Sequence, residues 1–270
     1  MNGPISRRHC IGSLTAGAAL GPGLLLGERP ENQRGAGAPG ASFPAQDPDL
    51  VREMVIVSHG NLERVTALLK DSPRLANAAY DWGFGDWETC LGAAAHTGRR
   101  KIAALLLENG ARPDVFAAAM LGHLDAVRAM IEAQPGLQRT RGPHGLTLMH
   151  HARAGGDESA KVVAYLGKLG DADVPYQDIP LSDAERDACI GEYSFGPRED
   201  QRFRVLVPEK DTHLAIQGDT GFPRQLFHQG GLSFHPTGAP EVRVGFAVEG
   251  MKAISATVTL PAPGLVGKRV

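Results

Sequence analysis

The sequence predicts a multidomain α+β protein in which an α-solenoid of about four helix pairs precedes a small antiparallel β-barrel or meander. Three observations lead to this fold class. A helix–turn–helix unit recurs between about residues 50 and 175, apolar and polar residues alternate after about residue 180, and residues 1–45 show neither period. Because helices and strands bury side chains with periods of 3.6 and 2 residues, the change of period marks a domain boundary. We expect an export segment and linker at 1–45, a helical domain at 46–178 and a β-domain at 179–270.

Composition and charge exclude several classes of protein. The 270 residues include 28 Lys and Arg against 30 Asp and Glu, a net charge of −2, which gives no general attraction to nucleic-acid phosphates. The three cysteines, Cys10, Cys90 and Cys189, are too few and too scattered for a disulfide scaffold, a zinc cluster or a redox pair. We expect Cys90 and Cys189 to be free, buried thiols. A run of about 18 apolar residues is absent from the sequence, which excludes a multi-span membrane protein.

The first 45 residues are predicted to direct export. A short basic start with Arg7 and Arg8 precedes a weakly hydrophobic stretch from Ile11 to Leu26 that contains four glycines and a proline. Those residues disfavour a buried helix, whereas the layout is typical of a cleaved signal. The segment resembles the twin-arginine signal of bacteria, although Cys10 replaces the usual phenylalanine. The resemblance implies a periplasmic or secreted protein with no stable membrane insertion after cleavage. Residues 28–48 carry proline, glycine, alanine and polar residues without periodicity, which predicts a linker.

The repeated unit is visible as three aligned segments: HGNLERVTALL, TGRRKIAALLL and LGHLDAVRAMI. In each, a glycine (Gly60, Gly98 or Gly122) precedes a small apolar residue by five positions and an aliphatic pair by eight to nine. A looser fourth copy is AGGDESAKVVAYL. A repeat with fixed offsets predicts stacked units that share a continuous core.

These segments resemble the ankyrin repeat, over about residues 50–175. Gly145 to Ala152, GLTLMHHA, matches its opening turn except for a leucine in place of proline, and Asn109-Gly110-Ala111 matches its close. The interval from Gly60 to Gly98 is longer than this family's unit and that from Gly98 to Gly122 is shorter, which predicts an enlarged turn between residues 77 and 88. The resemblance implies a protein-binding function through the exposed side of the stack.

The enlarged turn holds most of the predicted partner-binding residues: Tyr80, Trp82, Phe84 and Trp87, with His96 nearby. Buried tryptophan and tyrosine rings dominate the energetics of protein interfaces, so some of these rings are expected to anchor a protein partner, whose identity the sequence does not give. The alternative is that the rings fold back as a cap over the first repeat.

The histidines suggest a metal site, but a structural role is favoured. His144, His150 and His151 gather in the fourth opening turn, while His96 and His123 lie in helical segments. By the ankyrin resemblance, His150 occupies the position that makes backbone hydrogen bonds, and His151 is expected to face solvent. We therefore expect no metal and no cofactor.

The last 90 residues are predicted to be mostly strands. Ser182-Asp-Ala-Glu185 forms a capping box that predicts a short helix at about 183–188. Period-two alternation then predicts about seven strands, in an antiparallel meander or small barrel. The predicted strands are 190–194, 203–207, 214–217, 226–227, 232–234, 242–248 and 254–260.

This β-domain is similar to the lipocalin-like accessory module of bacterial serine hydrolases of the penicillin-binding-protein and esterase type. The resemblance rests on Gly191-Glu192-Tyr193 and on spaced aromatic residues. The module is noncatalytic in that family, and the hydrolase motifs Ser-x-x-Lys and Gly-x-Ser-x-Gly are absent from this sequence. We therefore expect a nonenzymatic, exported protein that binds a protein partner through its repeats, with the β-domain as a second contact surface. The alternatives are a carrier of a small apolar ligand in the barrel, and a hydrolase with a site around His213, His228 or His235.

Overall fold

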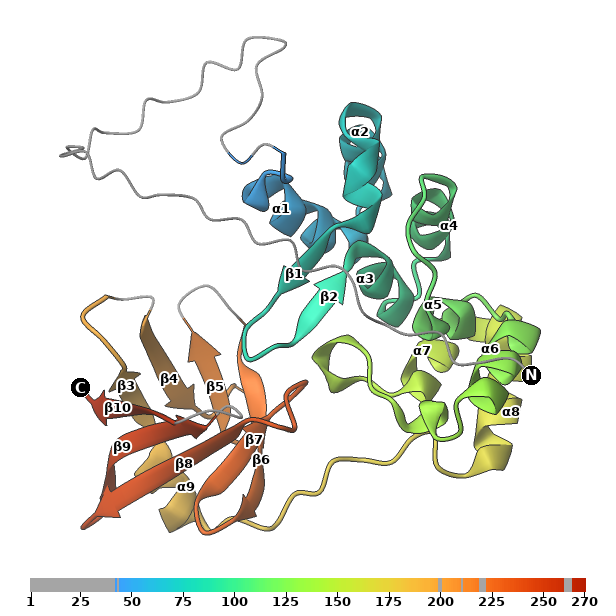
Figure 1. Cartoon of the computed structure of the whole chain (residues 1–270). Helices are drawn as coiled ribbons and strands as arrows, with labels where there is room; N and C mark the ends of the chain where they lie inside the picture. The colour runs from blue at the N-terminus through green and yellow to red at the C-terminus, as the bar shows by residue number, and fades with distance from the viewer. Residues whose placement is uncertain (1–41, 43, 199–200, 210, 219–221, 260–263) are drawn as a thin grey trace, which may run out of the picture. The chain divides into compact units, whose positions relative to one another are not determined.

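The computed structural model describes residues 42, 44–198, 201–209, 211–218, 222–259 and 264–270 (Figure 1). Within these ranges the chain forms nine α-helices and a closed barrel of eight antiparallel strands, so the mixed α+β class is confirmed. The predicted export signal and most of its linker lie outside the described residues. Among the helices that are described, none has the length and apolar character needed to cross a membrane.

Eight of the helices pack as four consecutive pairs (Figure 1). The first helix of each pair also contacts the first helix of the next, which gives a row of neighbouring helices. The pairs are α1 (Pro48–Ser58) with α2 (Leu62–Asp71), α3 (Cys90–His96) with α4 (Arg100–Glu108), α5 (Val115–Met120) with α6 (Leu124–Ala133), and α7 (Leu148–Ala154) with α8 (Ala160–Leu169).

Short elements connect these pairs. The enlarged turn between the first two pairs contains the 3₁₀-helix η1 (Pro73–Asn77) and the two-stranded hairpin of β1 (Ala79–Asp81) and β2 (Trp87–Thr89). Three further 3₁₀-helices follow: η2 (Leu137–Arg139), η3 (Pro143–Gly145) and η4 (Gly156–Ser159). The predicted enlargement at 77–88 is therefore a projecting β-hairpin.

The repeated glycines have a steric cause. Gly98 and Gly122 end turns with φ of +68° and +79°, where a side chain would be strained. A Cβ at Gly98 would lie 2.3 Å from the carbonyl oxygen of Ala154, and one at Gly122 would lie 2.2 Å from that of Glu158. Because no Cβ fits at such distances, these glycines allow the turns of the second and third helix pairs to approach the fourth pair through their backbones.

The barrel has the connectivity of a simple up-and-down meander. Each strand pairs with its neighbours in sequence, and the last strand pairs with the first to close the barrel. The strands are β3 (Gly191–Ser194), β4 (Arg202–Leu206), β5 (Ala215–Gly218), β6 (Arg224–Gly230), β7 (Ser233–Pro236), β8 (Arg243–Glu249), β9 (Lys252–Thr259) and β10 (Leu265–Arg269).

The predicted number of about seven strands was one too low, because β10 was missed. Leu265 and Val266 of β10 are both exposed, and Gly267 is the buried residue of the strand. The strand therefore lacks the alternation of large apolar and polar side chains that indicated the other seven. Its place is determined by pairing with β9 and β3 on its two sides.

Aromatic rings fill the inside of the barrel. Tyr193, Phe203, Phe234 and Phe246 are buried there, and the Tyr193 ring lies 5.7 Å from the Phe203 ring and 5.4 Å from the Phe246 ring. Helix α9 (Asp183–Cys189) precedes the barrel with the predicted capping box at Ser182. Within the described chain, the two cysteines are buried free thiols, as predicted.

Candidate metal centre

Four side chains from four separate elements of the helical part converge on one point. His59 follows α1, Glu88 lies at the centre of β2, His96 ends α3 and His144 lies within η3. Each offers one potential ligand atom, and these four atoms lie within 4.8 Å of one another. We call these four residues the histidine–glutamate cluster.

The distances inside the cluster suit metal coordination. The Nε2 atom of His96 lies 3.2 Å from Nε2 of His59 and 2.9 Å from Oε1 of Glu88. The Nε2 atom of His144 lies 3.5 Å from the same carboxylate oxygen, and that of His59 lies 3.6 Å from Oε2. A tetrahedral zinc ion with bonds near 2.0–2.1 Å separates its ligand atoms by about 3.3–3.4 Å. These four separations lie on either side of that value.

Two of the three imidazole rings, those of His59 and His144, are oriented by bonds from their second nitrogens. Nδ1 of His59 lies 3.1 Å from the carbonyl oxygens of Val55 and Ile56, so it carries a proton and leaves Nε2 with a lone pair. Nδ1 of His144 lies 3.1 Å from Oδ2 of Asp86. Outer partners of this kind fix the tautomer and the ring orientation of metal-binding histidines.

Glu88 supplies the negative charge of the cluster. Its side chain is fully buried, and Nε1 of Trp82 donates a hydrogen bond of 2.9 Å to Oε2. Burial alone would raise the pKa of Glu88, but hydrogen bonds from His144 and His96 outweigh it and lower the pKa to about 2. The carboxylate is therefore ionised, as a metal ligand must be.

His144 carries the balancing charge. Burial would lower the pKa of its imidazole, but bonds to the Asp86 and Glu88 carboxylates outweigh burial and raise the pKa to about 9. The cluster can therefore satisfy its buried carboxylate with a protonated histidine. A divalent cation can take over the same electrostatic role if His144 gives up that proton.

The donor set favours particular ions. Three imidazole nitrogens and one carboxylate suit zinc and its neighbours among the transition metals, whereas calcium and magnesium prefer oxygen ligands throughout. The cluster is also reachable, because the His59 side chain is 30% exposed.

This combination is not predicted from the sequence. His96 is predicted there as a partner-binding residue, a structural role is favoured over a metal site for the histidines, and neither His59 nor Glu88 is a candidate. His59 and His96 both lie at the ends of the first helices of consecutive pairs, but one residue before Gly60 and two before Gly98, so they do not share a repeat position. The contributions of Glu88 and His144 depend on the hairpin and on η3, whose positions the repeat pattern does not predict.

Two neighbouring histidines lie outside the cluster. His150 is exposed, and its Nε2 lies 3.2 Å from the carbonyl oxygen of His96, which is a backbone contact of the expected kind. The prediction that His151 faces solvent was wrong, because its side chain is fully buried next to Phe116. Burial lowers the pKa of His151 to about 4. His123 is exposed at the start of α6.

The predicted partner-binding residues divide into three environments. Tyr80 and Trp82 pack on the core of the first helix pairs, with their rings 4.9 Å apart, and Phe84 packs against barrel residues. Trp87 is 64% exposed. His96 belongs to the histidine–glutamate cluster.

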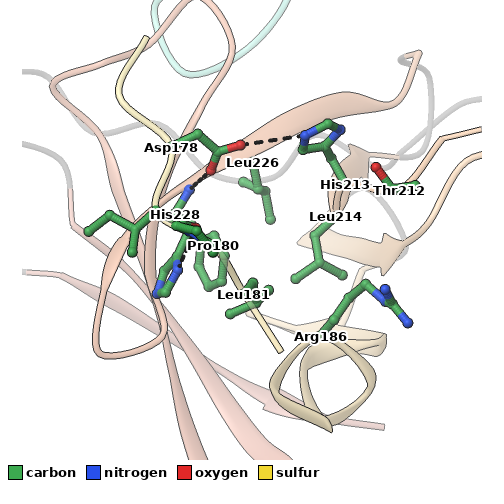
Figure 2. Close-up of a pocket in the computed structure, with 11 residues that line it drawn as sticks. Asp178, Pro180, Leu181, Arg186, Thr212, His213, Leu214, Leu226 and His228 are labelled. Atoms are coloured by element: carbon green, nitrogen blue, oxygen red, sulfur yellow. Dashed lines mark hydrogen bonds and ion pairs between the residues drawn. The ribbon is translucent and has the colours of Figure 1, made fainter. Parts of the chain in front are cut away.

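A pocket of about 260 Å³ opens beside the barrel, as Figure 2 shows. Leu181, Leu214 and Leu226 point toward one another across it. The other lining residues are Asp178, Ile179, Pro180, Arg186, Thr212, His213, His228 and Phe234. We call this set the barrel pocket.

Several polar groups of the barrel pocket bond to one another or to residues next to the pocket. Asp178 accepts a hydrogen bond of 2.8 Å from the backbone N–H of His228 and lies 3.5 Å from Nε2 of His213 (Figure 2). Arg186 pairs with Asp183 and Asp187. His235, the third histidine proposed for a hydrolase, is buried in β7 and stacks on Phe227. Among the described residues, the histidine–glutamate cluster is the one group of three or more His, Cys, Asp or Glu side chains whose ligand atoms could hold a metal ion.

Comparison with known proteins does not assign either site. No family model matches the sequence, and a search of curated proteins finds no match. Function has to be inferred from the geometry of the sites themselves.

Proposed function

We propose that this protein binds a divalent transition-metal ion, with zinc as the best fit, through His59, Glu88, His96 and His144. One observation carries the proposal: the four ligand atoms, from four separate elements, lie within 4.8 Å of one another around a fully buried carboxylate. Burying a carboxylate is costly unless it is paired, and the partners here are three imidazoles whose Nε2 atoms face it.

The metal is proposed to bind to a folded protein and not to nucleate folding. The helical part has apolar cores of its own, formed by residues such as Met54, Leu91, Leu106, Leu148 and Leu166. The second nitrogens of His59 and His144 are already held by hydrogen bonds. A site of this kind takes up and releases its ion without unfolding, which suits metal binding or delivery.

A metal-binding experiment tests the proposal. Zn²⁺, Co²⁺, Ca²⁺ and Mg²⁺ are titrated into the chelator-treated protein, with affinity measured by competition against a coloured chelator. We expect one equivalent of Zn²⁺ or Co²⁺ to bind and the two oxygen-preferring ions to fail. His96→Ala removes a ligand, and His213→Ala is the matched control in the barrel pocket. Equal zinc affinity in wild type and His96→Ala contradicts the proposal.

The scaffold of this site is proposed to be an ankyrin-type stack. Four helix pairs in a row, a hairpin between the first two and side-chain caps at Thr89 and Thr147 support this proposal. The barrel is proposed to be a lipocalin-like, noncatalytic module, which the up-and-down order of its eight strands supports. The twin-arginine resemblance supports a periplasmic or secreted location.

A second proposed function is binding of a protein partner by the hairpin. Trp87 favours it, because a tryptophan that is 64% exposed on a projecting hairpin is available to enter a partner's pocket. In a pull-down from periplasmic extract, Trp87→Ala is expected to lose a partner that the wild type enriches. Equal enrichment by both proteins contradicts this role. A carrier role is less favoured, because aromatic side chains fill the barrel.

A further inference from the structure

The metal ligand with the least ordinary backbone is His144. Its φ of 57° and ψ of 23° lie in the left-handed region, which residues other than glycine rarely adopt. Such a conformation persists only where surrounding contacts determine it, and it occurs frequently at functional sites. A specific contact is therefore expected to hold the backbone of His144 in this conformation.

Asp86 makes that contact with both of its carboxylate oxygens. Oδ1 accepts a hydrogen bond of 2.9 Å from the backbone N–H of His144, and Oδ2 lies 3.1 Å from Nδ1 of the same residue. The two contacts fix the strained backbone and the ring together. With Nδ1 committed to Asp86, Nε2 faces Glu88 and the proposed metal position.

Asp86 is in turn held by the barrel. Arg224 of β6 donates from Nη2 to Oδ2 of Asp86 and from Nη1 to the carbonyl oxygen of Gly83, the latter at 2.6 Å. Arg224 and Asp86 are 6% and 4% exposed, so this ion pair is shielded from solvent. A buried arginine of this kind fixes the geometry of its carboxylate more firmly than a surface pair does.

A second residue of the barrel, Gly238, packs against the carboxylate of Asp86. A Cβ at Gly238 would lie 2.7 Å from Cγ of Asp86 and within 2.9 Å of both carboxylate oxygens. The glycine backbone therefore packs directly on the carboxylate. Any side chain at residue 238 would displace Asp86.

From these contacts we infer that Asp86 is a positioning residue for the metal ligand His144, and that Arg224 and Gly238 of the barrel hold Asp86 in place. The inference rests on the proposed metal-binding function and adds to it. The ligands all belong to the helical part, yet one of them depends on the barrel for its orientation. The barrel thus becomes part of the metal site without supplying a ligand.

The test compares three variants with two matched controls. Asp86→Asn removes the charge that holds Nδ1 of His144, Arg224→Gln releases Asp86, and Gly238→Ala displaces Asp86 while leaving every charge in place. The controls are Asp173→Asn, a carboxylate that bonds Thr147 and Arg153, and Arg243→Gln, a barrel arginine that bonds the backbone oxygens of Pro240 and Val242.

Two readouts separate positioning from general stability. The first is cobalt affinity, expected to fall about 10–100-fold in Asp86→Asn, as for other outer partners of metal-bound histidines, with unchanged affinity in both controls. The second is the ¹⁵N imidazole spectrum of the zinc-loaded protein. In wild type we expect His144 with its proton on Nδ1, and in Asp86→Asn a loss of that single form.

The outcomes are distinct. If wild type fails to bind cobalt, the proposed metal-binding function itself is wrong. If wild type binds cobalt and all three variants keep its affinity within twofold, the positioning inference alone is overturned. If Asp86→Asn does not fold, Arg224→Gln and Gly238→Ala decide the question by the same two readouts.

Discussion

The histidine–glutamate cluster and the barrel pocket both combine histidines with a carboxylate, but they use them differently. In the cluster, three Nε2 atoms face one buried carboxylate, while the second nitrogens of His59 and His144 bind groups outside it. In the barrel pocket, Asp178 bonds a backbone N–H and one exposed histidine. Donor direction, more than residue type, therefore distinguishes the proposed metal site from the polar groups of the barrel pocket.

The largest expected effect is on zinc affinity, which substitutions in the histidine–glutamate cluster should lower and substitutions in the barrel pocket should not. His96→Ala is expected to weaken zinc binding by about 100-fold or more, beyond the range typical of outer-sphere changes, because a ligand is lost. His213→Ala in the barrel pocket is expected to change it by less than twofold. In thermal unfolding, zinc at 100 times the wild-type Kd is expected to stabilise wild type by about 2.7 kcal/mol and His96→Ala by no more than about 0.4 kcal/mol. A similar loss of zinc affinity in His96→Ala and His213→Ala would show that the two regions do not differ in metal binding.

The next effect concerns a histidine beside the cluster. The pKa of His151 is lowered to about 4 in the folded protein, whereas an unfolded histidine has a pKa near 6.5. Between these values the unfolded chain binds more protons, so stability is lost as the pH falls from about 6.5 to 4. The contribution is on the order of 3 kcal/mol.

Urea unfolding of wild type and His151→Gln in the presence of chelator measures this contribution. The stability of the variant relative to wild type should rise as the pH is lowered through that window. A difference between the two proteins that does not vary with pH would show that His151 is not buried in its neutral form.

Smaller effects are expected at the helix caps of the two regions. Thr147 accepts from the backbone N–H of His150 at the start of α7, and Ser182 accepts from that of Glu185 at the start of α9. Alanine at either position is expected to cost about 1 kcal/mol. Because the caps share no partner, the double variant should show the sum of the two losses in chemical denaturation. A strongly non-additive result would reveal coupling between the regions.

The smallest effect is expected at Trp87. Its side chain is 64% exposed, so Trp87→Ala should change stability by no more than about 0.5 kcal/mol. Zinc affinity should also stay within twofold of wild type, although the neighbouring residue in sequence is a ligand. Alternation along β2 is the reason, since Glu88 points inward while Trp87 points outward. A marked fall in the melting temperature would instead assign Trp87 to a structural cap.

Local sequence signals predicted much of the fold. The capping box at Ser182, the four helix pairs and seven of the strands follow from periodicity and from the chemistry of single residues. The spacing from Gly60 to Gly98 correctly indicated an enlarged turn. Strand β10 escaped because its apolar side chains are exposed and its pairing comes from residues far away in sequence.

Less of the candidate site than of the fold could be predicted from the sequence. His59 and His96 are 37 residues apart, and the contact between them depends on how one helix pair stacks on the next. Glu88 resembles any charged residue of a hairpin until its burial is known. His144 reaches the cluster through a left-handed turn that Asp86 holds. None of these conditions leaves a regular spacing in the sequence.

Crystals grown with zinc test most directly whether the histidine–glutamate cluster binds a metal ion. Anomalous scattering measured on both sides of the zinc absorption edge locates the ion independently of any assumption about its ligands. We expect one strong peak bonded to Nε2 of His59, His96 and His144 and to the carboxylate of Glu88. No peak at this position, with Nε2 of His96 still hydrogen-bonded to Glu88, would contradict it.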